Sequence, residues 1–128
     1  MTWTALVVGN GIFPADPQIR ALSYTNEDVT QFENLLGEPV VGKYVVLPPL
    51  RDEPHTVVGK QIELLLRDAK IEDRVLMYFS GHGRPDGHGH LRLLTVDSEL
   101  KALGETSVAA RSIHDFPYPV RAGRAPLI

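Results

Sequence analysis

The chain has 128 residues, a formal net charge of −3 from 13 basic and 16 acidic residues, and no cysteine. This length is typical of one domain. The interspersed charges exclude the basic surface that nucleic acid or an anionic membrane would need. No apolar run approaches the ~20 residues of a membrane-spanning helix. We therefore expect a soluble cytoplasmic protein that binds neither nucleic acid nor membrane, and the lack of cysteine excludes disulfides and a cysteine nucleophile of its own.

The first half of the chain predicts two strands, each followed by a helix. Residues 5–8 are a continuous apolar run that ends at a Gly-Asn-Gly turn, as in a strand buried on both faces. Residues 25–28 (TNED) fit a capping box and begin a helix that ends near Gly37. Residues 44–47 are a second, β-branched strand, which two prolines end. The second helix begins at Thr56, and its apolar stripe is Val58, Ile62, Leu65, Leu66 and Ala69.

The second half of the chain begins with a third buried strand. Residues 74–79 (RVLMYF) are that strand, and the glycine- and histidine-rich segment 80–90 (SGHGRPDGHGH) follows it directly. A tight turn at Asp86-Gly87 then predicts a hairpin, whose second arm is 90–96.

The end of the chain is less regular. A third helix is expected at about 106–116, with Ala109, Ile113 and Phe116 buried. The tail 117–128 holds three prolines and has no apolar periodicity. We therefore expect one domain over residues 1–116, followed by an irregular tail.

The order of these elements predicts the fold class. Strands that alternate with helices are joined by right-handed crossovers, which give an α/β fold with a mostly parallel sheet and helices on both of its faces. In such sheets, reactive groups gather beyond the carboxyl ends of the strands. His82 follows the third strand, so this topology places it at that edge.

Three histidines in the segment 80–90 raise the question of a metal site. His82, His88 and His90 could together bind zinc with one open coordination position. However, no helix fixes His82 beside the other two, and the flanking glycines preorganise the group poorly. The alternative is that His88 and His90 are solvated residues of a hairpin.

His82 differs from the hairpin histidines because it directly follows a buried strand and lies between Gly81 and Gly83. An imidazole at this position could act as a general base toward a nucleophile on a neighbouring strand. The backbone amide of Gly83 could face a developing oxyanion. The alternative is a glycine-rich turn that contains an inert histidine.

Several of these segments together resemble the amino-terminal part of a known family. They are residues 5–10 (ALVVGN), Leu22 with Asp28 six positions later, residues 78–83 (YFSGHG), and residues 93–97 (LLTVD). The pattern resembles the caspase-like domain of cysteine peptidases, and among its members the bacterial caspase-like and metacaspase-type proteins. The resemblance implies a three-layer sandwich with a mostly parallel sheet, from which the carboxyl-terminal strands of the family are missing here.

The resemblance also implies roles for individual residues. His82 matches the histidine of a Cys-His dyad, and Gly83 matches the residue whose amide stabilises the oxyanion. Asp28, Thr25 and Ser80 match positions that shape a pocket for Arg or Lys before the scissile bond, for which an acidic Asp28 is suited by charge. An alternative role for Asp28 is that of a capping-box carboxylate.

No cofactor is expected, and calcium is possible by family resemblance alone. Asp97 lies near the position where some members of the family bind that ion, but one carboxylate is far short of the six to eight oxygens that calcium takes.

The sequence departs from the family at the nucleophile. In caspases the cysteine follows the histidine by ~50 residues, and this chain contains none. A truncated product, a frameshifted end and a degenerate homologue would all have this pattern. We expect the chain to be the histidine-bearing segment of a cysteine endopeptidase, which is inactive in isolation and acts on polypeptides once a cysteine-bearing segment completes it. The alternative is a non-catalytic caspase-like module that forms a homodimer or binds a caspase-like partner chain.

Overall fold

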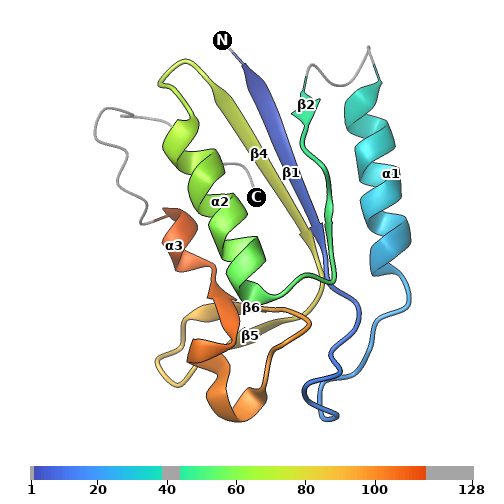
Figure 1. Cartoon of the computed structure of the whole chain (residues 1–128), viewed down its shortest axis with the longest axis vertical. Helices are drawn as coiled ribbons and strands as arrows, with labels where there is room; N and C mark the ends of the chain where they lie inside the picture. Colours follow the sequence, from blue (N-terminus) through green and yellow to red (C-terminus); the bar gives the residue numbers. More distant parts are fainter. Residues whose placement is uncertain (1, 39–43, 115–128) are drawn as a thin grey trace.

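The computed structural model describes residues 2–38 and 44–114 of the chain, and they form a mixed α/β fold with one mostly parallel sheet and one small antiparallel sheet (Figure 1). The elements of the parallel sheet and its helices are β1 (Trp3–Gly9), α1 (Thr25–Gly37), β2 (Val45–Val46), β3 (Leu50–Arg51), α2 (His55–Asp68) and β4 (Arg74–Ser80). The remaining elements are β5 (Gly83–Pro85), β6 (Leu91–Leu94), the 3-10 helix η1 (Leu100–Glu105), β7 (Ser107–Ala109) and α3 (Arg111–His114).

Strand β1 is the centre of the parallel sheet, as its continuous apolar run predicts. Strand β4 pairs with it along its whole length, from Trp3 opposite Arg74 to Gly9 opposite Ser80. The short strands β2 and β3 share the other edge of β1. They are two pieces of one strand, separated at the Pro48-Pro49 pair, because proline has no N–H to donate to a neighbouring strand.

The two long helices cover opposite faces of this sheet, so the prediction of helices on both faces is confirmed. Alternate residues of β1 point to opposite faces. One set, Ala5 and Val7, packs with Val29 and Leu36 of α1. The other set, Leu6 and Val8, packs with the α2 stripe of Val58, Ile62 and Leu66. Helix α2 begins at His55, one residue before the predicted start.

The predicted hairpin is present as β5 and β6, with Gly89 in the turn at a φ of 78°. Strand β7 adds to β6, so that these three strands form a second, antiparallel sheet. This pairing places Leu93 and Val108 in the same core cluster as α2, and thereby attaches the small sheet to the parallel one.

The third helix predicted at about 106–116 is wrong over residues 106–110. Residues 107–109 form β7, and within the described part of this range the helix is Arg111–His114. The backbone of 107–109 pairs with β6, and this pairing prevails over local helical preference. Val108 and Ile113 are buried, Ala109 is half-buried, and Phe116 lies outside the described residues, as does the tail 117–128.

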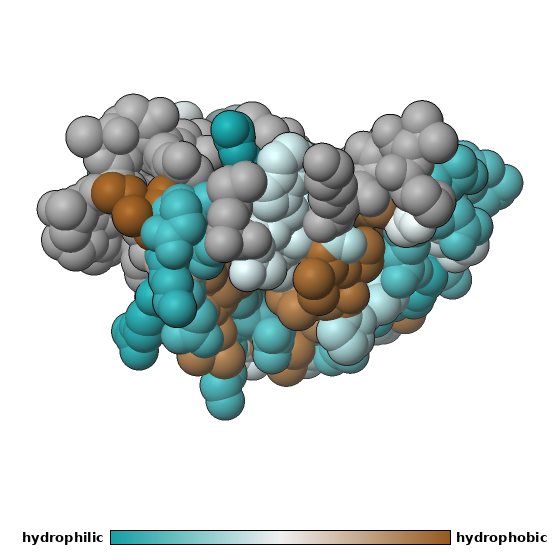
Figure 2. Space-filling model, turned by 90° about the horizontal axis from the view of Figure 1, so that it is seen from above, coloured by the Kyte–Doolittle hydropathy of each residue, from teal (hydrophilic) through white to brown (hydrophobic). Residues whose placement is uncertain are grey.

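Large hydrophobic side chains on the surface are scattered over several elements. Viewed from above, hydrophobic atoms form separate patches between hydrophilic ones (Figure 2). Among residues 2–38 and 44–114, the exposed large hydrophobic side chains are those of Ile12, Tyr24, Leu35, Val45, Leu64, Ile71 and Leu91. Among the described helices, none is long and apolar enough to cross a membrane.

Candidate functional site at the carboxyl end of the sheet

The carboxyl ends of β1 and β4 meet at a buried asparagine. The Asn10 amide N–H donates to the carbonyl of Ser80 at 2.9 Å, and its side-chain Nδ2 donates to the carbonyl of Leu94 at 2.9 Å. Asn10 is fully buried. It therefore joins the parallel sheet to β6 at the point where the glycine-rich segment leaves β4.

Asp28 and Ser80 are in direct contact at this edge. The Ser80 hydroxyl donates to Asp28 Oδ2 at 2.8 Å, across 52 positions of sequence. Ser80 is nearly buried at the end of β4, whereas Asp28, on the first turn of α1, is half-buried. Burial raises the pKa of the Tyr78 phenol nearby, and the negative charge of Asp28 adds to this effect. The structure thus brings together two of the three residues expected to shape a substrate pocket.

Thr25, the third of these residues, packs behind them against glycines of β1 and its turn. A Cβ at Gly11 would lie 2.3 Å from Thr25 Oγ1, and a Cβ at Gly9 would lie 3.2 Å from the Thr25 carbonyl oxygen. At Gly11 a side chain would require Thr25 to move, and at Gly9 the contact with the Thr25 carbonyl would be tight. Because Gly9 pairs with Ser80, Thr25 lies at the same corner as Asp28 and Ser80 but is itself buried.

The capping box predicted at residues 25–28 is wrong. Tyr24 is the N-cap of α1, and no side chain caps the helix. Thr25 is already the first helical residue, so Asp28 lies one position beyond the third helical residue, from which a capping-box carboxylate reaches back to the cap. Its carboxylate accepts from Ser80 instead, which removes the capping role as an alternative for this residue.

His82 is held in a defined position beyond the end of β4. Its Nε2 lies 2.7 Å from the carbonyl oxygen of Arg20. Its ring packs on the ring of Phe13, with centroids 5.2 Å apart and planes inclined by 50°. Phe13 is buried with Ile19 and Leu94 in a small core cluster. The histidine is therefore anchored to the loop between β1 and α1, although it belongs to a glycine-rich segment.

The contact with Arg20 determines which nitrogen of His82 carries the proton. A carbonyl oxygen can only accept, so Nε2 is the donor. In the neutral ring Nδ1 then has a free lone pair, and it makes no hydrogen bond to any described residue. Such an imidazole can accept a proton at Nδ1 while remaining fixed at Nε2.

Gly83 begins β5 and pairs with Leu93 of β6. It is exposed, and a Cβ at this position would lie 3.0 Å from Leu91 Cδ1. Gly83 is therefore accessible to solvent directly after His82, but a side chain at this position would crowd Leu91.

The three histidines of segment 80–90 are not brought together. His88 and His90 lie at the hairpin turn with ring centroids 6.3 Å apart, whereas His82 faces Phe13 and Arg20. The backbone amides of His88 and His90 both donate to Asp86 Oδ1. Within residues 2–38 and 44–114, no three His, Cys, Asp or Glu side chains gather as metal ligands would.

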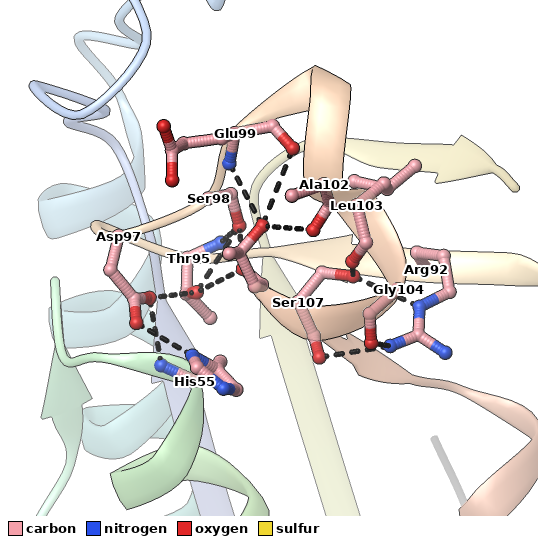
Figure 3. Close-up of polar contacts among 11 residues, drawn as sticks. His55, Arg92, Thr95, Asp97, Ser98, Glu99, Ala102, Leu103, Gly104 and Ser107 are labelled. Carbon is pink, nitrogen blue, oxygen red and sulfur yellow. Dashed lines mark hydrogen bonds and ion pairs between the residues drawn. The ribbon is translucent and has the colours of Figure 1, made fainter.

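Asp97 is paired with His55 rather than open to a cation (Figure 3). The carboxylate accepts from the His55 amide at 2.9 Å, from the Thr95 hydroxyl at 2.7 Å, and contacts His55 Nδ1 at 2.6 Å. Burial works to raise the pKa of Asp97, but the hydrogen bonds from Thr95 and His55 outweigh it and hold the pKa below its ordinary value. The pair attaches the first residue of α2 to the segment after β6.

The partners of the two histidines at this edge have no signal in the sequence pattern. The partner of His82 is a backbone carbonyl, which any residue at position 20 would provide. The His55–Asp97 pair joins residues 42 positions apart. The Pro-His start of α2 could have indicated a histidine near the carboxyl end of the sheet, since the loop from β3 to α2 must pass there.

Comparisons with known proteins add no family to this geometry: no protein-family model matches the chain, and no curated protein matches its sequence.

Proposed function

We propose that this chain is the histidine-bearing segment of a caspase-like cysteine endopeptidase. The observation that carries the proposal is the geometry of His82, anchored through Nε2 with Nδ1 free at the carboxyl end of β4. A parallel sheet with helices on both faces supports the finer assignment to a caspase-like three-layer sandwich. Because the chain has no cysteine, the nucleophile must come from a completing segment, and the isolated chain is inactive.

The proposed chemistry uses the outer edge of β4. Within the described residues, β4 pairs with β1 alone. A completing strand along that outer edge would end beside His82, at the carboxyl end of the sheet. A cysteine there would lose its thiol proton to His82 Nδ1 and attack the peptide carbonyl. His82 would then protonate the leaving amine, the Gly83 amide would bind the oxyanion, and water would release the acyl group.

The proposed preference for a basic residue before the cleaved bond rests on the neighbouring residues Asp28, Ser80 and Thr25. The Ser80 hydroxyl orients the Asp28 carboxylate, and Thr25 packs behind it. A carboxylate fixed in this way, and half-buried, suits an Arg or Lys side chain of the substrate. We therefore propose cleavage after Arg or Lys.

The test is to complete the chain. A designed segment that continues the sheet beyond β4 and ends in cysteine is fused after the chain, and cleavage of matched Arg, Lys and Asp fluorogenic peptides is measured. We expect cleavage of the Arg and Lys peptides, its loss in His82→Ala, and its retention in the control His90→Ala, which alters an exposed hairpin histidine. Full activity in His82→Ala would remove this residue from the mechanism.

A non-catalytic module is the second candidate, favoured by the unpaired outer edge of β4 in the described structure. Such an edge offers free backbone N–H and C=O groups to another chain. A homodimer or a complex with a caspase-like partner would cover it. Size-exclusion chromatography with light scattering tests this function: a folded monomer that no caspase-like chain binds would count against it.

A further inference from the structure

A hollow of about 360 Å³ lies beside His82. It is lined by Gln18, Ile19, Arg20, His82 and Arg84. Two of its five lining residues are arginines that are distant in sequence. Arg20 belongs to the loop before α1, and Arg84 lies in the middle of β5. The fold therefore brings two positive charges next to the imidazole that we propose as the general base.

Neither arginine has a counterion in the described part of the chain. Arg20 and Arg84 are exposed, and neither side chain forms an ion pair or hydrogen bond with a described residue. Other arginines do: Arg51 pairs with Glu33, and Arg67 with Glu63. The difference is notable in a chain whose acidic residues outnumber its basic ones, at 16 against 13.

The nearest acidic residues in sequence are occupied elsewhere. Asp16 accepts from the amides of Gln18 and Leu100, and Asp86 accepts from the amides of His88 and His90. These backbone hydrogen bonds lower the pKa of both carboxyls. The two carboxylates thus stabilise loop and hairpin turns, and the guanidinium groups at the hollow are left for a ligand.

We propose that this hollow binds an acidic side chain of the polypeptide substrate, on the leaving-group side of the scissile bond. The inference rests on the proposed function, in which His82 gives its proton from Nδ1 to the leaving amine, so the substrate residue that follows the cleaved bond passes this histidine, and His82 also lines the hollow. Guanidinium groups bind carboxylates with parallel N–H donors and are hard to replace by lysine in this respect. With Asp28 at the other corner, the preferred substrate has a basic residue before the cleaved bond and an acidic residue after it.

The first experiment measures binding to the whole 128-residue chain, without completion. Two end-blocked peptides that differ only in Glu or Gln directly after a common Arg are titrated into the labelled chain, and the backbone amide signals of Arg20, His82 and Arg84 are followed by NMR. We expect the Glu peptide to bind about fivefold more tightly, the size expected of two solvent-exposed ion pairs. This preference should shrink as salt is added.

Variants assign the preference to the hollow. Arg20→Gln and Arg84→Gln should each reduce it, and the double variant should abolish it. Arg67→Gln, an exposed arginine on α2 that is paired with Glu63, is the matched control and should keep it. Equal binding of the Glu and Gln peptides, or a preference that persists in the double variant, would overturn the proposal.

The outcome is separable from that of the proposed function. Cleavage by the completed protein is measured independently, with the same two peptides. A preference for Glu in binding without any cleavage would retain the acidic-side-chain site and reject the peptidase. Cleavage of both peptides at equal rates with equal binding would retain the peptidase and reject this site.

Discussion

Two histidines of this protein are fixed by different partners near the same edge of the parallel sheet. His82 follows β4 and contacts a neutral backbone carbonyl through Nε2 at 2.7 Å. His55 follows β3 at the start of α2 and contacts the Asp97 carboxylate through Nδ1 at 2.6 Å. The two contacts are similar in length, but the partner of His82 is neutral and the partner of His55 is a carboxylate.

Under the proposed function, that difference separates the histidine that takes part in catalysis from one that only stabilises the fold. A carbonyl fixes the orientation and the tautomer of an imidazole without adding a charge, so Nδ1 of His82 keeps a free lone pair. The Asp97 carboxylate also accepts from the His55 amide and the Thr95 hydroxyl. It therefore connects α2 with the segment after β6.

Substitution of Phe13, which packs on the ring of His82, should lower the free energy of unfolding the most. Phe13→Ala removes a ring that is 4% exposed and packs on the imidazole. We expect a loss of about 3–5 kcal/mol in the free energy of unfolding, because the cavity adds to the lost burial. Urea denaturation measures it, with Leu91→Ala, at an exposed position, as the control that changes stability by less than about 0.5 kcal/mol. A similar effect of both substitutions would contradict the buried role of Phe13.

Breaking the His55–Asp97 pair should have a smaller effect. Asp97→Asn removes the charge but keeps the shape, and the side chain of Asp97 is 36% exposed. We expect a loss of roughly 1 kcal/mol in the free energy of unfolding, since solvent screens a pair of this exposure. In the completed protein, cleavage should persist, because His82 has no contact with this pair. Loss of cleavage in a folded Asp97→Asn protein would show that the two histidines are coupled.

The contribution of Asp97 should also depend on pH. Its pKa is lower in the folded protein than its ordinary value, so the stabilisation is present above the unfolded-state pKa of about 4. It is lost as the pH falls through the lower folded-state pKa, because the carboxyl is then protonated in the folded and the unfolded protein alike. The difference in urea midpoint between the wild type and Asp97→Asn should therefore narrow from pH 7 into this acidic range. A difference that widens on acidification would be inconsistent with a lowered pKa.

Substitution of the hairpin histidines, His88 and His90, should have the smallest effect on stability and on cleavage. His88 and His90 are exposed at the turn between β5 and β6, and their amides, not their rings, bind Asp86. Replacing both with Ala should change the free energy of unfolding by less than about 0.5 kcal/mol. In the completed protein it should leave cleavage unchanged. A large loss of either would assign these rings a role that their surroundings do not indicate.

The apolar strands and helices of the parallel sheet, and the hairpin of β5 and β6, could be predicted from the sequence, whereas strand β7 could not. The apolar runs at β1 and β4 and the stripe on α2 are patterns of neighbouring residues, so they identify a buried strand or helix face directly. Residues 107–109 contain no such pattern. They form a strand because β6 is beside them.

Local patterns of residues predict three features: a parallel α/β layer, helices on its two faces, and His82 at the carboxyl end of β4. What that histidine and its neighbours contact depends on the tertiary structure. His82 meets the carbonyl of Arg20 across 62 positions, Ser80 meets Asp28 across 52, and His55 meets Asp97 across 42. Periodicity reports which face of an element is buried, but contacts over such separations depend on how loops close between elements, and no local pattern of residues contains that information.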